Sequence, residues 1–276
     1  MNTLTKKLND YLDMRRALGF KLARHEHELQ KFIAFLHAQA AAFITTELAL
    51  TWAQQPRQSS PSYHAKRLGM VRDFARYLSA SDPRTEVPPQ GLLPAQPQRA
   101  QPYIYRDDEI LALVRGAAAL RPTAGLRSHT YATLFGLLAV TGTRIGEILA
   151  LDRDDVDLQR SVLTVTKSKF NKTRLVPLHE STVRKLKAYA RRRNTLLSPA
   201  KSSALFVSEC GARLNRCAVR HIFIRVSRLI GLREATDSHG PRLHDLRHTF
   251  AVKTLINWYR AGFNVEQRLL AFLKGL

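Results

Sequence analysis

The sequence has only two cysteines among its 276 residues, Cys210 and Cys217. Two thiols are too few for a disulfide scaffold, and no second pair completes a four-ligand zinc site. We therefore expect reduced thiols and no metal. Long apolar runs are also missing, because the stretch from Leu134 to Val140 is far shorter than the roughly 20 residues that span a bilayer. The N-terminus carries no apolar leader, so we expect a soluble cytoplasmic protein without a membrane partner.

Acidic residues are scarce relative to basic ones. Asp and Glu number 22 against 44 Lys and Arg, which gives a formal net charge of +22 and a sequence pI near 10.7. A surface this basic concentrates polyanions, and neutralisation of phosphates supplies the sequence-independent part of nucleic-acid affinity. With 45% hydrophobic residues, the chain can still bury a core. The composition therefore predicts a globular protein whose first partner is nucleic acid.

Proline is concentrated in one stretch of the chain. Six of the twelve prolines lie between Pro83 and Pro102, where they disfavour both helix interiors and central strands. We interpret residues 83–102 as a linker between an N-terminal domain, residues 1–82, and a C-terminal domain, residues 103–276. Most of the excess positive charge lies in the C-terminal domain.

The periodicity of apolar residues differs between the two domains. In the N-terminal domain it is helical throughout, in the stretches 4–18, 29–36, 46–52 and 63–78. In the C-terminal domain helices are expected at 107–114, 131–138, 145–149, 182–193 and 215–230, and again after Pro241. The β-rich runs 161–166 and 173–178 flank a basic turn and predict an antiparallel hairpin, with a short strand expected at 205–208. The expected fold class is mainly α with a small antiparallel β-sheet in the C-terminal domain, after an all-helical N-terminal domain.

The motif T-G-T-R-I-G-E places an arginine where the backbone suits an anion. Arg144 lies just after the break at Gly142, at a predicted helix start, where free N–H groups and the helix dipole favour negative charge. Its guanidinium can bind two phosphate oxygens at once. Glu147, one helical turn later, can hold that guanidinium from behind, because a buried arginine needs a partner.

Two further patterns add cations to the same kind of site. Lys169 lies near the tip of the predicted hairpin, from where an ammonium can reach a site built by other elements. In H-D-L-R-H, the side chains of His244, Arg247 and His248 share one stripe of the helix after Pro241. Two arginines, a lysine and histidines converging on one phosphate would form a metal-free phosphoryl-transfer site.

The order of these patterns resembles the tyrosine recombinase (phage integrase) family over residues 103–255. The matching motifs are T-G-x-R-x-x-E-x-x-x-L, a hairpin ending R-L-V-P-L, and H-x-L-R-H-T-F-A. The helical N-terminal domain resembles the family's core-binding (SAM-like) DNA-binding domain. The resemblance implies an integrase-like catalytic domain from a mobile element, which recombines or integrates DNA site-specifically through a 3′-phosphotyrosine without metal or nucleotide cofactor. It also implies double-stranded DNA and other recombinase protomers, including self-association, as partners, and a prokaryotic nucleoid-associated location.

Four residues match the family's catalytic positions: Arg144, Lys169, His244 and Arg247. The resemblance implies that the two arginines clamp the scissile phosphate, the lysine protonates the leaving 5′-oxygen and the histidine assists acid/base chemistry and charge stabilisation. Glu147 and His248 match as supporting residues. Lys167 and Lys172 are close alternatives to Lys169.

The sequence departs from the family near its end. The family pattern calls for a Leu-Gly-His element and then the nucleophilic tyrosine, but no His, Trp or Tyr follows Tyr259. Tyr259 lies 12 residues beyond Arg247 and beside Trp258, where an aromatic is most simply a packing residue. We therefore expect a chain truncated before its nucleophile, and without a tyrosine hydroxyl no covalent intermediate forms. Whether the chain is active alone is left open.

Two other interpretations remain open at this point. The first is a catalytically inactive DNA-binding remnant, or a partner that receives the tyrosine in trans from a full-length recombinase. The second is a zinc metallohydrolase with His244 and His248 as ligands one helical turn apart. H-D-x-x-H lacks the glutamate base of such enzymes, and Arg247 would lie beside the metal.

Overall fold

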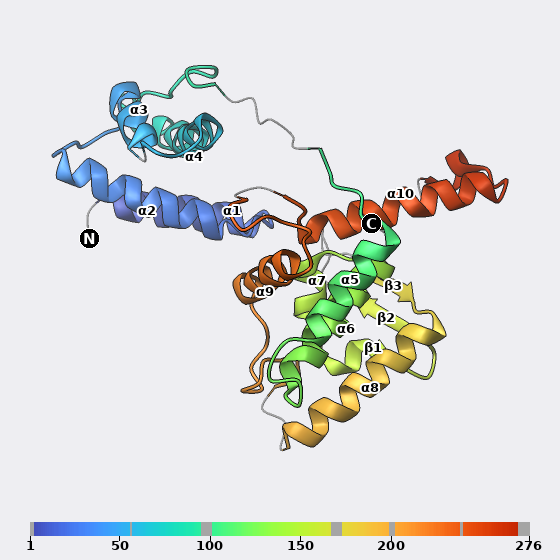
Figure 1. The fold of residues 1–276 in the computed structure, drawn as a ribbon. Helices are drawn as coiled ribbons and strands as arrows, with labels where there is room; N and C mark the ends of the chain where they lie inside the picture. Colours follow the sequence, from blue (N-terminus) through green and yellow to red (C-terminus); the bar gives the residue numbers. More distant parts are fainter. Residues whose placement is uncertain are drawn as a thin grey trace. The chain divides into compact units, whose positions relative to one another are not determined.

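The computed structural model describes residues 3–55, 57–94, 101–166, 173–198, 202–237 and 240–269. The chain forms two compact units, residues 1–100 and 101–276, and each has its own apolar core. Figure 1 shows the helices and strands of each unit along the chain. No helix in the described part of the chain is long and apolar enough to cross a membrane.

The described residues of the N-terminal unit are helical, as expected. They form α1 (Thr3–Ala17), α2 (Ala23–Ala38), α3 (Thr46–Gln54) and α4 (Pro61–Ser79). Side-chain caps fix two of the helix starts: the Thr45 hydroxyl accepts the N–H of Leu48 at 3.2 Å, and the Ser60 hydroxyl accepts that of Tyr63 at 3.3 Å. Leu18, predicted on the first stripe, lies just beyond the end of α1 and is exposed. The other parts of the stripes meet in one core, whose largest buried side chains include Leu29, Phe32, Leu36, Trp52 and Phe74.

An ion pair is buried inside this unit. Nη1 of Arg67 lies 3.6 Å from Oε2 of Glu28, and both residues are buried. The Tyr63 hydroxyl donates to Oε1 of Glu28 at 3.2 Å, and Nη2 of Arg67 donates to the Trp52 carbonyl at 3.1 Å. The same guanidinium lies over the Trp52 ring, 3.7 Å from its centroid. The pair therefore joins α2, α3 and α4 through polar contacts within the apolar core.

The first half of the proline-rich stretch, which was interpreted as a linker, packs against the N-terminal unit. Val87 and Leu93 pack against the core of the N-terminal unit. The Arg72 guanidinium of α4 donates to the carbonyl oxygens of Pro88 and Pro89 at 2.6 and 2.7 Å. Proline lacks an N–H, but its carbonyl still accepts hydrogen bonds, and here a side chain supplies the donor. Described residues beyond residue 82, as far as Leu93, therefore pack with the N-terminal unit.

The C-terminal unit combines helices with a three-stranded sheet, which confirms the expected fold class. Its described elements are α5 (Asp107–Ala118), α6 (Leu126–Thr141), α7 (Ile145–Ala150), the 3-10 turn η1 (Arg153–Asp155), β1 (Val156–Asp157), β2 (Val162–Val165), β3 (Arg174–Pro177), α8 (Glu180–Leu196), α9 (Arg216–Leu229) and α10 (Leu243–Arg260). The predicted hairpin is the antiparallel pair β2–β3, in which Val162 lies opposite Pro177. Figure 1 shows α8 beside this sheet and α10 extending from the other end of the unit.

Three details of this unit were not predicted correctly. The short strand β1 pairs with β2 and was not expected. The stretch 205–208 forms only an isolated bridge, between Val207 and Arg213, in place of a strand. The sequence predicts Ile110, Leu111 and Val114 on the apolar face of α5, but Leu111 is exposed. The buried residues of this helix are Leu113 and Ala117. Helix α6 is buried along most of its length and contacts α5, α8 and α10, so it forms the centre of this core.

Candidate functional site

The turn between α6 and α7 sets the position of Arg144. Helix α6 ends at Gly142, which has a φ of +59° and therefore a left-handed backbone that glycine adopts without a Cβ penalty. The hydroxyl groups of Thr141 and Thr143 lie 2.8 Å apart across this turn. Arg144 then occupies the N-cap of α7. The predicted break and helix start are both present, and they hold Arg144 between two helices.

The carboxylate of Glu147 fixes this turn through four hydrogen bonds. Oε2 accepts the backbone N–H of Arg144 at 2.9 Å and Nη2 of Arg174 at 2.7 Å. Oε1 accepts Nη1 of Arg144 at 3.0 Å and Nη1 of Arg174 at 3.2 Å. Burial by itself raises the pKa of Glu147, but hydrogen bonds from Arg174 and Arg144 outweigh it and leave this pKa below its usual value. Glu147 is thus ionised at neutral pH and holds Arg144, as the sequence predicted.

Arg247 reaches the same turn from α10. It is 9% exposed, and its Nη1 donates to the Gly142 carbonyl at 2.6 Å. Burial and then the charge of Arg144 lower the pKa of Arg247 to about 10, with Glu147 acting in the opposite direction and Arg174 in the same one. Arg247 remains charged at neutral pH. The positive charges of the two predicted arginines therefore interact across Gly142 and Glu147, although they lie about a hundred residues apart in the sequence.

The start of α10 is anchored by polar contacts that sequence reasoning did not identify. The buried carboxylate of Asp245 accepts the backbone N–H of Arg242 at 2.9 Å. The buried Tyr105 donates its hydroxyl to the Arg242 carbonyl at 3.0 Å, and Nε of Arg233 donates to the Pro241 carbonyl at 3.0 Å. These contacts fix the first turn of α10 and with it the direction in which Arg247 points.

His244 and His248 lie one helical turn apart on α10 and contact each other. Their rings meet edge to face with centroids 4.8 Å apart. His244 is exposed and His248 is half-buried, so neither is a core histidine. Partial burial, then His248 and Arg247, lower the pKa of His244 from its usual value. The imidazole of His244 is thus neutral at neutral pH and accessible on the same helix as Arg247.

Lys169 and its alternatives Lys167 and Lys172 lie outside the described residues. The residue that sequence reasoning missed is Arg174, at the start of β3. The available signal was its place in R-L-V-P-L, opposite the buried Val165 of β2. A charged side chain at such a position needs a partner, and Glu147 provides it.

Tyr259 lies far from this cluster. It is 69% exposed and close to the end of α10. Twelve residues separate it from Arg247 along one helix, which corresponds to about 18 Å at 1.5 Å per residue. Two other tyrosines of this unit are already engaged, because the Tyr103 hydroxyl donates to Glu109 and that of Tyr105 donates to Arg242.

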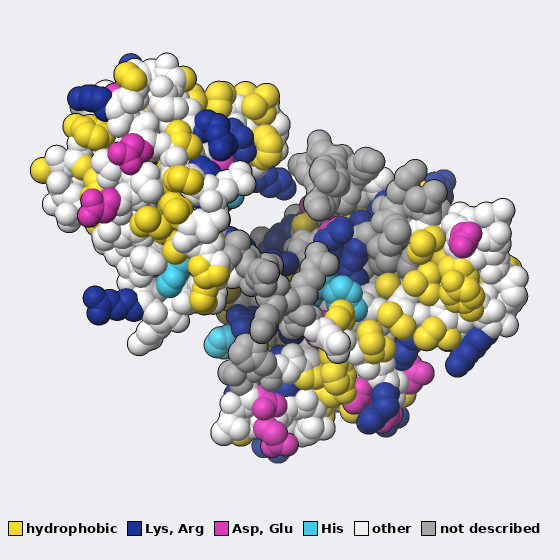
Figure 2. Space-filling view, turned by 90° about the horizontal axis from the view of Figure 1, so that it is seen from above, with side chains coloured by type: hydrophobic (Ala, Val, Ile, Leu, Met, Phe, Trp, Pro, Cys, Tyr) yellow, Lys and Arg dark blue, Asp and Glu magenta, His cyan; other side chains and the backbone are white. Residues whose placement is uncertain are grey.

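The cluster around Glu147 is strongly positive. Arg144, Arg174 and Arg247 carry three positive charges against the one negative charge of the carboxylate. Figure 2 shows Lys and Arg side chains on the surface of both units. Such a centre favours a phosphate or another anion with more than one oxygen. Among the described residues, no group of three His, Cys, Asp or Glu side chains could hold a metal ion.

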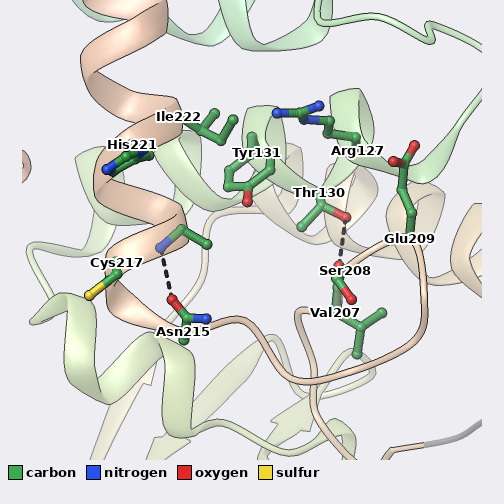
Figure 3. Close-up of a pocket in the computed structure, with 11 residues that line it drawn as sticks. Arg127, Thr130, Tyr131, Val207, Ser208, Glu209, Asn215, Cys217, His221 and Ile222 are labelled. Atoms are coloured by element: carbon green, nitrogen blue, oxygen red, sulfur yellow. Dashed lines mark hydrogen bonds between the residues drawn. The ribbon is translucent and has the colours of Figure 1, made fainter.

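A pocket of about 440 Å³ lies between α6, α9 and the segment from Val207 to Asn215, and Figure 3 shows it. The Thr130 hydroxyl donates to the Val207 carbonyl at 3.3 Å, and Oδ1 of Asn215 caps α9 by accepting the N–H of Ala218 at 2.8 Å. None of the predicted site residues that the structure describes lines this pocket. The site described above is therefore a separate feature of the unit.

The chain is similar in sequence to known integrases and recombinases. Residues 106–266 match the phage integrase family. The chain is 50% identical over 277 residues to the putative integrase/recombinase y4rB of Sinorhizobium fredii, and this covers 99% of the chain and 88% of that protein. It is 32% identical over 209 residues to the tyrosine recombinase XerD of Mycobacterium tuberculosis (strain ATCC 25618 / H37Rv), which covers 75% of the chain and 64% of that protein.

Solved structures show the same fold at low sequence identity. A Tn1549 transposon integrase in complex with a circular intermediate DNA has a TM-score of 0.64 and 14% identity, and covers 95% of this chain and 89% of that one. A lambda integrase dimer bound to a COC′ core site has a TM-score of 0.59 and 19% identity, and covers 90% of this chain and 88% of that one. Both comparisons concern the fold alone.

Proposed function

The chain belongs to the phage integrase family of tyrosine recombinases, and from this we propose that its C-terminal unit holds the DNA phosphate at which a strand is broken and rejoined. Site-specific DNA recombination is the function that the family supports. The observation that carries the proposal is the cluster of Arg144 and Arg247 around Gly142 and Glu147. The family does not favour the zinc interpretation of His244 and His248.

Arg144 and Arg247 would bind the scissile phosphate from two sides. Arg144 is partly exposed and held by Glu147, so part of its guanidinium can face a ligand. Arg247 is buried and adds a fixed positive charge beneath the same point. As a tyrosine oxygen attacks the phosphorus, negative charge grows on the non-bridging oxygens, and fixed guanidinium groups stabilise that charge without reorganising.

The leaving oxygen needs a proton when its bond to phosphorus breaks. In the proposed reaction a tyrosine forms a 3′-phosphotyrosine, the bond from phosphorus to the 5′-oxygen breaks, and Lys169 passes a proton to that oxygen. Neutral His244, with His248 beside it, assists by accepting or donating a proton near the phosphate. The assignment uses no metal or nucleotide cofactor.

The proposed reaction takes place on DNA that several protomers share. We propose that this chain acts on double-stranded DNA together with other recombinase protomers. We assign the attacking hydroxyl to none of the described tyrosines of the C-terminal unit, because Tyr259 lies twelve residues beyond Arg247 on α10 and the hydroxyls of Tyr103 and Tyr105 are engaged by Glu109 and Arg242. A lambda integrase dimer on a core site and a lambda integrase tetramer on a Holliday junction are solved examples of such assemblies within the same fold.

A cleavage assay with a nicked suicide duplex tests this proposal. The Sinorhizobium fredii relative would be added as tyrosine donor in a form whose own phosphate-binding arginines are replaced by alanine. We expect a covalent adduct on the donor only when the chain carries both Arg144 and Arg247, and no adduct with the donor alone. The surface variant Arg184→Ala, which loses only an exposed pair with Glu180, is the matched control and should support full cleavage.

Two results would contradict the proposal. An adduct that forms equally well with Arg144→Ala would show that this arginine does not hold the reacting phosphate. A phosphotyrosyl peptide that contains Tyr259, found by mass spectrometry, would show that the chain carries its own nucleophile. Binding of the variants to uncleavable duplex is measured in parallel, so that loss of chemistry is distinguished from loss of affinity.

A further inference from the structure

Arg174 has no assigned role in the reaction, yet it makes the closest contact with the Glu147 carboxylate. Its Nη1 and Nη2 each donate to a different oxygen of Glu147, at 3.2 and 2.7 Å. The side chains of Arg174 and Glu147 are only 13% and 9% exposed. A buried, bidentate pair of this kind is held in one geometry, unlike an ion pair on the surface.

Arg174 affects the orientation of Arg144 because both arginines donate to the same two oxygens of Glu147. Oε1 of Glu147 accepts one hydrogen bond from Arg174 and one from the Arg144 side chain. Oε2 accepts one from Arg174 and one from the Arg144 backbone. The two bonds from Arg174 set the plane of the carboxylate, and that plane sets the direction of the Arg144 guanidinium. Without Arg174 the carboxylate keeps, among the described residues, its two hydrogen bonds from Arg144 and is free to rotate with it.

Arg174 also contributes charge that Glu147 does not balance. The single carboxylate faces three guanidinium groups, and the charge of Arg174 acts on Arg247 as well as on Glu147. Nε of Arg174 is buried and has no hydrogen-bond partner among the described residues. A cation retained at this position, in excess of what the carboxylate needs, increases the positive potential at the cluster.

We propose that Arg174 is a positioning residue for the reacting phosphate. It fixes Glu147, through Glu147 it orients Arg144, and it adds positive charge behind the two arginines that contact the phosphate. This inference rests on the proposed function, because it takes Arg144 and Arg247 as the phosphate-binding pair. Arg174 itself makes no contact with the phosphate.

The test uses the full chain labelled with 15N-arginine and titrated with inorganic phosphate. The Nε–H signals of Arg144 and Arg247 report binding at this site alone. Arg174→Lys keeps the charge but loses the planar pair of donors, so we expect phosphate to bind about tenfold more weakly at Arg144. Affinity for duplex DNA should change less than about twofold, since one site among many phosphate contacts is affected. Arg184→Lys on α8 is the matched control and should leave both affinities unchanged.

The outcomes separate this inference from the proposed function. Phosphate affinity at Arg144 that is unchanged in Arg174→Lys, while urea denaturation shows lower stability, would overturn the positioning role and leave Arg174 purely structural. Phosphate that does not shift the Arg144 and Arg247 signals in the unmodified chain would contradict the proposed function instead. Arg174→Gln, which has no charge, should weaken binding more than Arg174→Lys, and equal binding in these two variants would exclude the contribution of charge.

Discussion

The Phe250 ring of α10 lies against Gly142, at the place where a side chain would begin, so that an added Cβ would overlap the ring. Gly142 also has a φ of +59°, which L side chains rarely adopt. We expect Gly142→Ala to destabilise the C-terminal unit by roughly 2–4 kcal/mol, since backbone strain and overpacking both contribute. Urea denaturation of the full chain, followed by signals of that unit, measures the loss.

Gly231→Ala is the matched control for this substitution. Gly231 has a φ of +70° but no atom within 4 Å of the position of an added Cβ. It should therefore lose only the backbone contribution, about 1 kcal/mol. Equal losses in the two variants would show that the Phe250 contact carries no energy.

The buried pair of Glu28 and Arg67 allows a second prediction. Arg67→Met leaves the Glu28 carboxylate buried without its cation, and we expect the N-terminal unit to lose about 3–5 kcal/mol. The double variant with Glu28→Gln should be more stable than Arg67→Met, because the uncompensated charge is removed. A double-mutant cycle in urea checks this, and additive losses would count against the pair.

Acid should reduce the contribution of Glu147. Its pKa lies below the ordinary value, so the ionised form stabilises the fold at neutral pH, and this stabilisation is lost as pH falls from the unfolded pKa of about 4.3 through the lower folded pKa. The difference in unfolding free energy between the unmodified chain and Glu147→Gln should be constant above about pH 6 and shrink below about pH 4. Urea denaturation at several pH values measures it. A difference in unfolding free energy that grows as the pH falls would contradict a lowered pKa of Glu147 in the folded state.

The peptide bond after Arg84 should resist trypsin in the native chain. Thr85 is buried, and the N–H of Glu86 donates to the Ile44 carbonyl at 2.9 Å, so this backbone cannot enter a protease without local opening. We expect the exposed bond after Arg57 to be cut earlier, as followed by mass spectrometry of the fragments. Removing the Glu86 side chain, whose carboxylate accepts the N–H of Thr46, should speed cutting after Arg84. Faster cutting after Arg84 than after Arg57 in the unmodified chain would show that residues 84–86 are not held against the N-terminal unit.

Most of the fold could be predicted because it depends on local signals. The stripes from Leu29 to Leu36 and from Met70 to Leu78 have one apolar face, and the structure buries that face. The proline-rich stretch was harder, because its packing depends on Arg72, a residue on another element, which reaches the carbonyl oxygens of Pro88 and Pro89. Proline content indicates where a helix cannot form, but it does not indicate whether an extended segment finds partners.

Only part of the candidate site could be predicted from the sequence. Arg144 and Glu147 were predictable as a pair. They lie three residues apart at the start of one short helix, and side chains at this spacing are neighbours. Arg174 was not, because its contact with Glu147 crosses from a strand to a helix and depends on how the hairpin packs. The anchor of α10 that Tyr105 provides on Arg242 joins residues 137 positions apart and leaves no local pattern.

The Glu147 carboxylate caps α7 and also binds Arg174 of β3. A newly made chain can therefore complete its phosphate site only after both elements have been synthesised. During synthesis α7 leaves the ribosome before β3, and α10 follows much later. An incomplete chain therefore has basic residues that attract DNA, but it lacks Arg174 to orient Arg144 and Arg247 to complete the pair. On the proposed assignment, a nascent or partly folded molecule can occupy DNA without cutting it, so strand breakage is restricted to molecules that have finished folding.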